Sequence, residues 1–157
     1  MGSLTTIMIS GGFDPIHTGH IRMIQTAAKH GRVIAVLNSD EWLVRKKGFY
    51  FMSWKERAEI VLSIKGVVAV EKVNDADNTV CEALERLKPD YFANGGDRGM
   101  NNTPEQDVCK KLGIQLMWGV GGAYKANSSS DLISRILLVH PETKSFFDNK
   151  LVRKSER

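Results

Sequence analysis

Short apolar runs alternate with segments of helical spacing along most of the chain. Residues 6–9 form an apolar run that ends at a glycine pair, and residues 18–28 then carry apolar side chains at helical spacing. Residues 33–37 are aliphatic and β-branched throughout, which is typical of a strand buried on both faces. We therefore predict a strand, a glycine turn, a helix and a second strand by residue 37.

The same alternation continues to about residue 138. Ser53 and Glu56 have capping-box spacing, and Thr103 with Pro104 and Gln106 marks another helix start. Further strands are expected at 67–73, 91–93 and 114–118. Further helices are expected at 54–64, at 78 or 79 to 87, at 104–112 and at 129–138. About five strands alternating with helices predict a single Rossmann-like α/β domain, in which a parallel sheet has helices on both faces.

Length and composition fit this single domain. The chain has 157 residues, of which 42% are apolar, and no apolar run approaches the roughly 18 residues that span a bilayer. The N-terminus does not resemble a signal peptide, so we expect a cytoplasmic protein without a membrane segment. Cys81 and Cys109 have neither disulfide-framework nor zinc-site spacing, and His30 and His140 lack a partner ligand at suitable spacing. No metal site is therefore predicted from the protein's own residues.

The net charge of +4 is concentrated at the C-terminus. The last eight residues alone supply +3 of it, so residues 1–149 are nearly neutral. A short basic tail is more often solvated than bound to nucleic acid, and we do not expect a nucleic-acid partner.

Glycines and histidines are concentrated in the turn before the first helix. Gly11 and Gly12 end the strand, and His17, Gly19 and His20 stand at the helix start. Glycines let a ligand approach the backbone closely, and a helix N-terminus offers free N–H groups to an anion. Because the two histidines are three residues apart, both can face the same phosphates. The spacing is neither that of a Walker loop nor that of a dinucleotide-binding turn.

This turn resembles the HxGH signature of the nucleotidyltransferase superfamily, with His17-Thr18-Gly19-His20 at its fixed positions. The rest of the chain is similar, in the same order, to glycerol-3-phosphate cytidylyltransferases and to the heptose-phosphate adenylyltransferase domain. The similar segments are 36–40, 46–47, 54–57, 88–90 and 94–97. Ser128-Ser129-Ser130 stands where the family has an Ile-Ser-Ser/Thr-Thr motif. The resemblance implies a nucleotidyltransferase domain over residues 1–140, with a basic C-terminal extension over 141–157.

The implied reaction moves CMP from CTP, or AMP from ATP, to a phosphorylated small molecule such as a sugar phosphate or polyol phosphate, and releases pyrophosphate. Cytidylyl transfer is slightly favoured. A phosphate nucleophile is already ionised near neutral pH, so the reaction needs positioning and charge neutralisation rather than a strong base. Mg²⁺ would arrive with the nucleoside triphosphate. A homodimer is also implied by the resemblance.

The resemblance also suggests roles for individual residues. His17, His20 and Lys46 are the expected catalytic residues, with Lys46 as a mobile cation in a loop. Arg57 and Lys47 are expected at the acceptor phosphate, since the planar fork of an arginine suits bidentate phosphate binding. The expected nucleotide-binding residues are Gly11, Gly12, Phe13, Asp14, Gly19, Gly95, Asp97, Ser128, Ser129 and Ser130.

Other functions remain open. Residues 13–17 are also similar to the pantetheine-phosphate and nicotinate-mononucleotide adenylyltransferases, and a non-catalytic nucleotide sensor on the same fold is a further alternative. The family usually places an arginine shortly before its last motif. Here the nearest cations are Lys125 and Arg135, which leaves the choice between CTP and ATP open.

Overall fold

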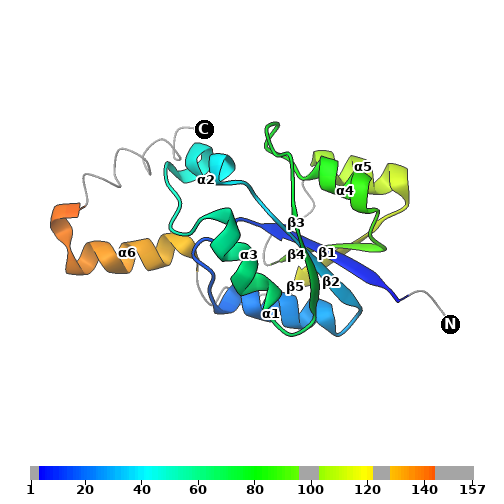
Figure 1. The fold of residues 1–157 in the computed structure, drawn as a ribbon, viewed down its shortest axis with the longest axis horizontal. Helices are drawn as coiled ribbons and strands as arrows, with labels where there is room; N and C mark the ends of the chain where they lie inside the picture. Colours follow the sequence, from blue (N-terminus) through cyan, green and yellow to red (C-terminus); the bar gives the residue numbers. More distant parts are fainter. Residues whose placement is uncertain (1–3, 96–102, 122–127, 144–157) are drawn as a thin grey trace.

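The computed structural model describes residues 4–95, 103–121 and 128–143. Within these residues, five parallel strands form one sheet in the order β3-β2-β1-β4-β5 (Figure 1). The strands are β1 (Thr6–Gly11), β2 (Arg32–Leu37), β3 (Val67–Lys72), β4 (Tyr91–Gly95) and β5 (Gln115–Val120). The predicted α/β class and parallel sheet are confirmed.

Helices cover both faces of the sheet. They are α1 (Thr18–Ala28), α2 (Asp40–Lys47), α3 (Trp54–Leu62), α4 (Cys81–Leu87), α5 (Pro104–Leu112) and α6 (Ser129–Val139), followed by the 3₁₀ turn η1 (Pro141–Thr143). α1 and α3 pack on one face, and α4 and α5 pack together on the other (Figure 1). α2 lies beyond the carboxyl end of β2.

The core consists of two apolar clusters separated by the sheet. Ile7 and Ile9 of β1 belong to the cluster under α1 and α3, whereas Met8 belongs to the cluster under α4 and α5. All three side chains are fully buried. Because successive strand residues point to opposite faces, a central strand covered on both sides requires a continuous apolar run. This explains why β1 and β2 lack polar alternation.

The strand order reverses between β1 and β4. From β1 the chain adds β2 and β3 on one side, then returns to place β4 and β5 on the other. In open parallel sheets, ligands bind beyond the carboxyl ends of the strands at such a reversal. The turn after Gly11 and the end of β4 at Gly95 lie at this edge, so the fold brings together two segments expected to bind nucleotide.

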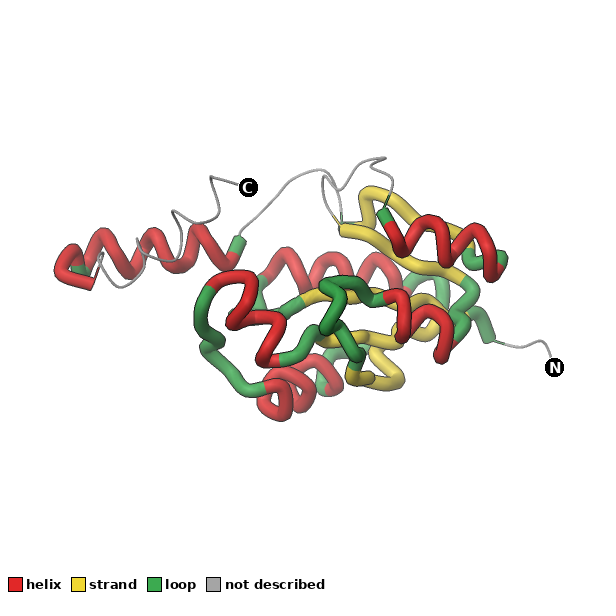
Figure 2. Tube along the Cα trace, turned by 90° about the horizontal axis from the view of Figure 1, so that it is seen from above, coloured by secondary structure: helices red, strands yellow, loops and turns green. Residues whose placement is uncertain are grey.

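The last described helix extends away from the sheet. Figures 1 and 2 show α6 projecting from the body of the molecule. Ile133 is buried, while Leu138 and Val139 near its end are exposed. Across the described ranges, none of the helices combines the length and hydropathy needed to traverse a bilayer. Residues 144–157, including most of the expected extension, lie outside the described residues.

The structure corrects two local expectations. The segment around Lys46, predicted as a loop, is helix α2, capped by Ser39 and ended by Gly48 at φ 87°. Helix α4 begins at Cys81 rather than at 78 or 79. There, the Asp77 carboxylate accepts hydrogen bonds from the Thr79 N–H and hydroxyl, and this local turn competes with a helical start.

Candidate active site

Two histidines form the N-terminal cap of α1. His17 is the N-cap residue, and its Nδ1 accepts a hydrogen bond from the Gly19 N–H at 3.1 Å. His20 completes a capping box, because its Nδ1 accepts from the His17 N–H at 3.2 Å. Each ring therefore satisfies a backbone donor that the helix cannot satisfy itself. The two histidine rings thus lie side by side at the start of α1, as their spacing predicts.

These bonds also set where each ring carries its hydrogen. A nitrogen that accepts from a backbone N–H bears no hydrogen, so in the neutral ring the hydrogen sits on Nε2. The rings stack with centroids 3.9 Å apart, and Phe13 packs against His20 at 4.7 Å. Burial, and secondarily the charge of His17, lowers the pKa of His20 to about 3. His20 is thus a neutral Nε2–H donor at physiological pH.

Asp14 joins this turn to the segment between α2 and α3. Its carboxylate is buried and accepts hydrogen bonds from the N–H groups of Phe51 and Met52, at 2.8 and 2.9 Å. Lys47 forms an ion pair with it at 2.9 Å and also donates to the Asp14 carbonyl. Asp14 and Lys47, expected at the nucleotide and at the acceptor phosphate, therefore bind each other in this structure.

Arg57, expected at the acceptor phosphate, is also turned inward in this structure. Its side chain is fully buried and donates to three carbonyl oxygens, at 2.7 to 3.0 Å. These carbonyls belong to Gly12, Asn38 and Met52. A fourth bond, of 2.6 Å, joins the guanidinium to the Asp40 carboxylate. Arg57 therefore connects the turn after β1, the end of β2 and the α2–α3 segment, and does not present its guanidinium to an acceptor phosphate here.

Lys46 stands in the last turn of α2. Its ammonium lies 4.3 Å from the centroid of the Trp42 ring, a cation–π distance. Arg45 and Lys47 flank it, and three cations at a helix C-terminus interact favourably with the helix dipole. Lys46 thus remains an exposed cation near the site, but on a helix rather than in a mobile loop.

Gly12 has a role in packing in addition to its expected role in nucleotide binding. A Cβ at Gly12 would lie 2.9 Å from Leu43 Cδ2, so the buried Leu43 side chain of α2 would have to shift. Gly11 ends β1, and its carbonyl accepts from the Asn38 N–H at 3.0 Å. Gly12 therefore allows Leu43 of α2 to pack closely against the turn after β1.

The remaining expected nucleotide-binding residues are only partly described. Ser128 caps α6: its Oγ accepts from the Asp131 N–H at 3.1 Å and donates to the Asp131 carboxylate at 2.7 Å. Ser129 and Ser130 are the first two residues of α6, and their side chains are not among the parts that the structure describes. Asp97 and Lys125 fall outside the described residues, and Arg135 is exposed on α6.

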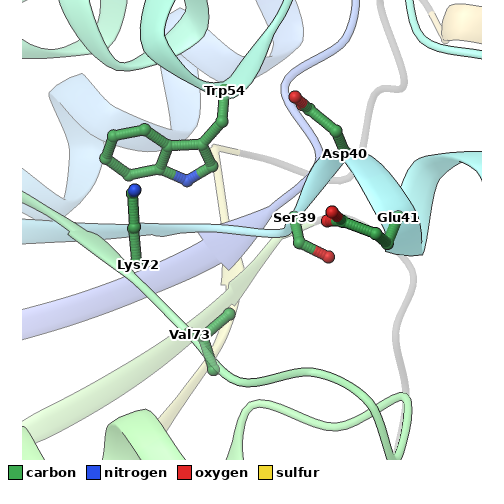
Figure 3. Close-up of a pocket in the computed structure, with 6 residues that line it drawn as sticks. All are labelled: Ser39, Asp40, Glu41, Trp54, Lys72 and Val73. Atoms are coloured by element: carbon green, nitrogen blue, oxygen red, sulfur yellow. The ribbon is translucent and has the colours of Figure 1, made fainter.

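A pocket that sequence reasoning missed opens beside this region. We call it the Trp54 pocket. It has a volume of about 220 Å³ and is lined by Ser39, Asp40, Glu41, Trp54, Lys72 and Val73 (Figure 3). The signal that could have revealed it is Trp54 at the first position of α3, near the carboxyl ends of β2 and β3. In the described ranges, no cluster of three or more His, Cys, Asp or Glu side chains is arranged to hold a metal ion.

One known protein family covers most of this chain. Residues 8–135 match the model of a family described as cytidylyltransferase-like. The chain belongs to this family. It is accordingly a nucleotidyltransferase, and the matched range contains the capping histidines, Arg57, the Trp54 pocket and the cap of α6.

Several proteins resemble this cytidylyltransferase-like chain. An FAD synthase of Methanothermobacter marburgensis is 28% identical over 154 residues, 96% of this chain and 92% of that protein. The bifunctional protein HldE of Syntrophotalea carbinolica is 32% identical over 138 residues, 85% of this chain but only 27% of that protein. A solved lipopolysaccharide core biosynthesis protein from Thermoplasma volcanium has a TM-score of 0.63 at 22% identity, over 74% of this chain and 95% of that one. That structural likeness supports the fold.

Proposed function

We propose that this protein transfers AMP or CMP from a Mg²⁺-bound nucleoside triphosphate to a phosphorylated small molecule, with release of pyrophosphate. The observation that carries the proposal is the histidine capping box. It fixes two imidazoles at a helix N-terminus, beside the reversal point of a parallel sheet.

The reaction requires little acid–base chemistry. An oxygen of the acceptor phosphate attacks the α-phosphorus, a new P–O bond forms, and the bond to the β-phosphate breaks so that pyrophosphate leaves. The Nε2–H groups of His17 and His20 donate to phosphate oxygens as negative charge shifts during this displacement. Because the pKa of His20 is about 3, it acts as a hydrogen-bond donor and not as a general acid at neutral pH. Mg²⁺ belongs to the substrate complex and is held by phosphate oxygens and water.

Lys46 supplies mobile positive charge. Its side chain is exposed and its ammonium lies over Trp42, and the flexible lysine stem lets this charge turn toward a bound triphosphate. Lys47 and Arg57 act differently, by holding the loops around the site. The end of β4 with Asp97, and Ser128–Ser130, are the proposed contacts to the base, ribose and phosphates.

ATP is the donor that the relatives favour. FAD contains an AMP unit, so an enzyme named FAD synthase and similar to this chain over 96% of its length supports adenylyl transfer. CTP remains the alternative, as the family description indicates. We also propose that the protein is a homodimer and that it acts in the cytoplasm.

The test has two stages. Thermal unfolding is measured with Mg²⁺ and each of ATP, CTP, GTP and UTP, because a ligand that binds the folded state raises the melting temperature. Pyrophosphate release is then measured with the best triphosphate and a panel of phosphorylated acceptors. We expect a shift with ATP and acceptor-dependent pyrophosphate release. Binding without release across the panel would indicate a nucleotide sensor, and no binding would contradict the proposal.

A further inference from the structure

Phe13 has a backbone conformation that a bulky side chain rarely adopts. It follows Gly12 in the turn after β1, and its φ is 52°, in the left-handed region. The two glycines before it do not take this conformation, although a glycine would do so without strain. A phenylalanine is held in a strained conformation only where the surrounding contacts compensate for the strain. The contacts of the Phe13 ring therefore indicate what this residue does.

The Phe13 ring packs inside the protein against the histidine cap. Phe13 is only 1% exposed, and its ring centroid lies 4.7 Å from that of His20, with the planes tilted by 38°. The His20 ring also stacks on His17 at 3.9 Å and accepts a hydrogen bond from the His17 N–H. Gly11 leaves room for the phenylalanine, because a Cβ there would lie 3.3 Å from Phe13 Cε2. Phe13, expected to bind nucleotide, thus contacts the His20 imidazole in this structure.

Apolar contact has a chemical effect on an imidazole. Burial is the main cause that lowers the pKa of His20 to about 3, and the charge of His17 is the lesser cause. The other charged groups beside the turn are the Asp14 carboxylate and the Lys47 ammonium, which form an ion pair with each other at 2.9 Å. Loss of apolar cover, rather than a change of charge, is therefore the perturbation to which the His20 pKa should respond most.

We propose that Phe13 is a positioning residue for the transfer reaction, because its ring shields and immobilises the His20 imidazole and so keeps the Nε2–H group directed at the phosphates. This role rests on the proposed function, since Phe13 acts on the reaction only through His20. A donor that is already in place needs no rearrangement when charge shifts onto a phosphate oxygen. A ring that is free to tilt would lose this alignment, which lowers kcat without weakening the binding of either substrate.

The first experiment titrates His20 in the protein without substrates. Phe13→Leu keeps an apolar side chain but removes the ring, and Phe13→Ala removes most of the cover. Phe92→Leu is the matched control, because Phe92 is 3% exposed and packs in the cluster under α4 and α5. The ring signals of His20 are identified in NMR spectra by their loss in His20→Gln, and they are followed from about pH 8 down to the onset of acid unfolding.

The His20 pKa should separate the two sites. We expect it to rise from about 3 toward the ordinary 6.5 in Phe13→Ala, far enough for His20 to titrate before the protein unfolds. The rise should be smaller in Phe13→Leu, which carries the test if Phe13→Ala does not fold. In Phe92→Leu the His20 pKa should stay at its wild-type value, because that substitution leaves the histidine cap covered.

The second experiment measures steady-state turnover of the folded variants at about pH 8, where His20 is neutral in all of them. We expect kcat to fall at least about tenfold in Phe13→Leu, because the His20 donor acts on charge that develops in the transition state. The KM values for triphosphate and acceptor should stay near wild type. A purely structural role for Phe13 would lower the urea midpoint but leave the His20 pKa and kcat unchanged, as we expect for Phe92→Leu.

The outcomes distinguish the role of Phe13 from the proposed function. If pyrophosphate is released but the His20 pKa is unchanged in both folded Phe13 variants, the positioning role is overturned and the reaction stands. A raised pKa without a lower kcat, or an equal change in Phe92→Leu, also overturns the role. If the pKa rises in the Phe13 variants but not even wild type releases pyrophosphate, Phe13 does shield His20, while the transfer reaction and the part of Phe13 in it are refuted.

Discussion

Replacing Arg57 by methionine should destabilise the fold far more than an exposed arginine replacement does. Methionine keeps most of the length and the apolar contacts but removes every donor. The Asp40 carboxylate would lose its 2.6 Å partner, and the carbonyls of Gly12, Asn38 and Met52 would lose theirs. An acceptor that loses its donor inside the protein costs about 1–3 kcal/mol, so the three carbonyls together account for at least about 3 kcal/mol, whereas the Asp40 side chain is 28% exposed and can be hydrated. We expect a loss of that size, a large share of the roughly 5–15 kcal/mol that stabilises a domain.

Urea unfolding of wild type and variants measures this loss directly. Arg86→Met is the matched control, since Arg86 pairs with Glu71 and Glu82 on the surface and its side chain is 42% exposed. Exposed pairs contribute about 0–1 kcal/mol, so the control should change little. If Arg57→Met prevents folding altogether, Arg57→Lys should still fold with an intermediate loss, because it keeps the charge without the fork. A loss below about 1 kcal/mol for Arg57→Met, together with a raised acceptor KM, would show that Arg57 is an acceptor ligand after all.

Three further predictions follow from single contacts. Because the pKa of His20 is lowered from 6.5 to about 3, the unfolded chain binds a proton between these pH values that the folded protein does not. The free energy of unfolding should therefore fall as pH falls through this range, by at most about 1.4 kcal/mol per pH unit. Urea midpoints of wild type and His20→Asn are measured as a function of pH, and equal pH slopes for the two proteins would contradict this prediction. Ser53→Ala removes the cap shared with Glu56 at the start of α3, so we expect a loss of about 1 kcal/mol in the same assay. Gly31→Ala would place a Cβ 2.5 Å from the Thr5 carbonyl oxygen, so it should lower the melting temperature clearly, and an unchanged value would refute this close approach.

Strands and helix starts could be predicted where the local sequence pattern has a clear physical cause. The apolar runs of β1 and β2 predicted buried parallel strands because both faces of each are covered. The Ser53 cap predicted the start of α3, and its capping box is present. Ser128 likewise caps α6 as expected. Thr103 and Gln106 also have the spacing of a capping box, but α5 begins at Pro104 without one, because the Thr103 side chain makes no cap hydrogen bond.

Helix α2 was missed although its signals were present. Ser39 precedes two acidic residues, three basic residues end the helix, and Gly48 adopts the left-handed conformation that commonly ends helices. The helix has only eight residues, of which Leu43 is buried, so its apolar periodicity is weak. The run of three cations at residues 45–47 therefore led to the prediction of a loop.

The inward turn of Arg57 could not be read from its position. An arginine on an amphipathic helix is almost always exposed, and only tertiary structure brings three carbonyls and a carboxylate from distant segments around it. The histidine cap is an intermediate case. Its spacing of three residues is that of a capping box, but imidazoles are not the usual capping side chains. The sequence therefore predicted that the two rings lie together, but it did not predict which ring nitrogen carries the hydrogen.

The most direct test of the central claim is the rate of pyrophosphate release after each histidine of the cap is changed. His17→Gln and His20→Gln are compared with His30→Gln, whose side chain is exposed beyond the end of α1. Loss of one preorganised donor to a developing oxyanion lowers turnover by about a hundredfold or more. We predict that loss for each cap variant, with His30→Gln unchanged and with all three variants folded by circular dichroism. Near-wild-type turnover in either folded cap variant would contradict the assignment of the histidine turn as the reaction centre.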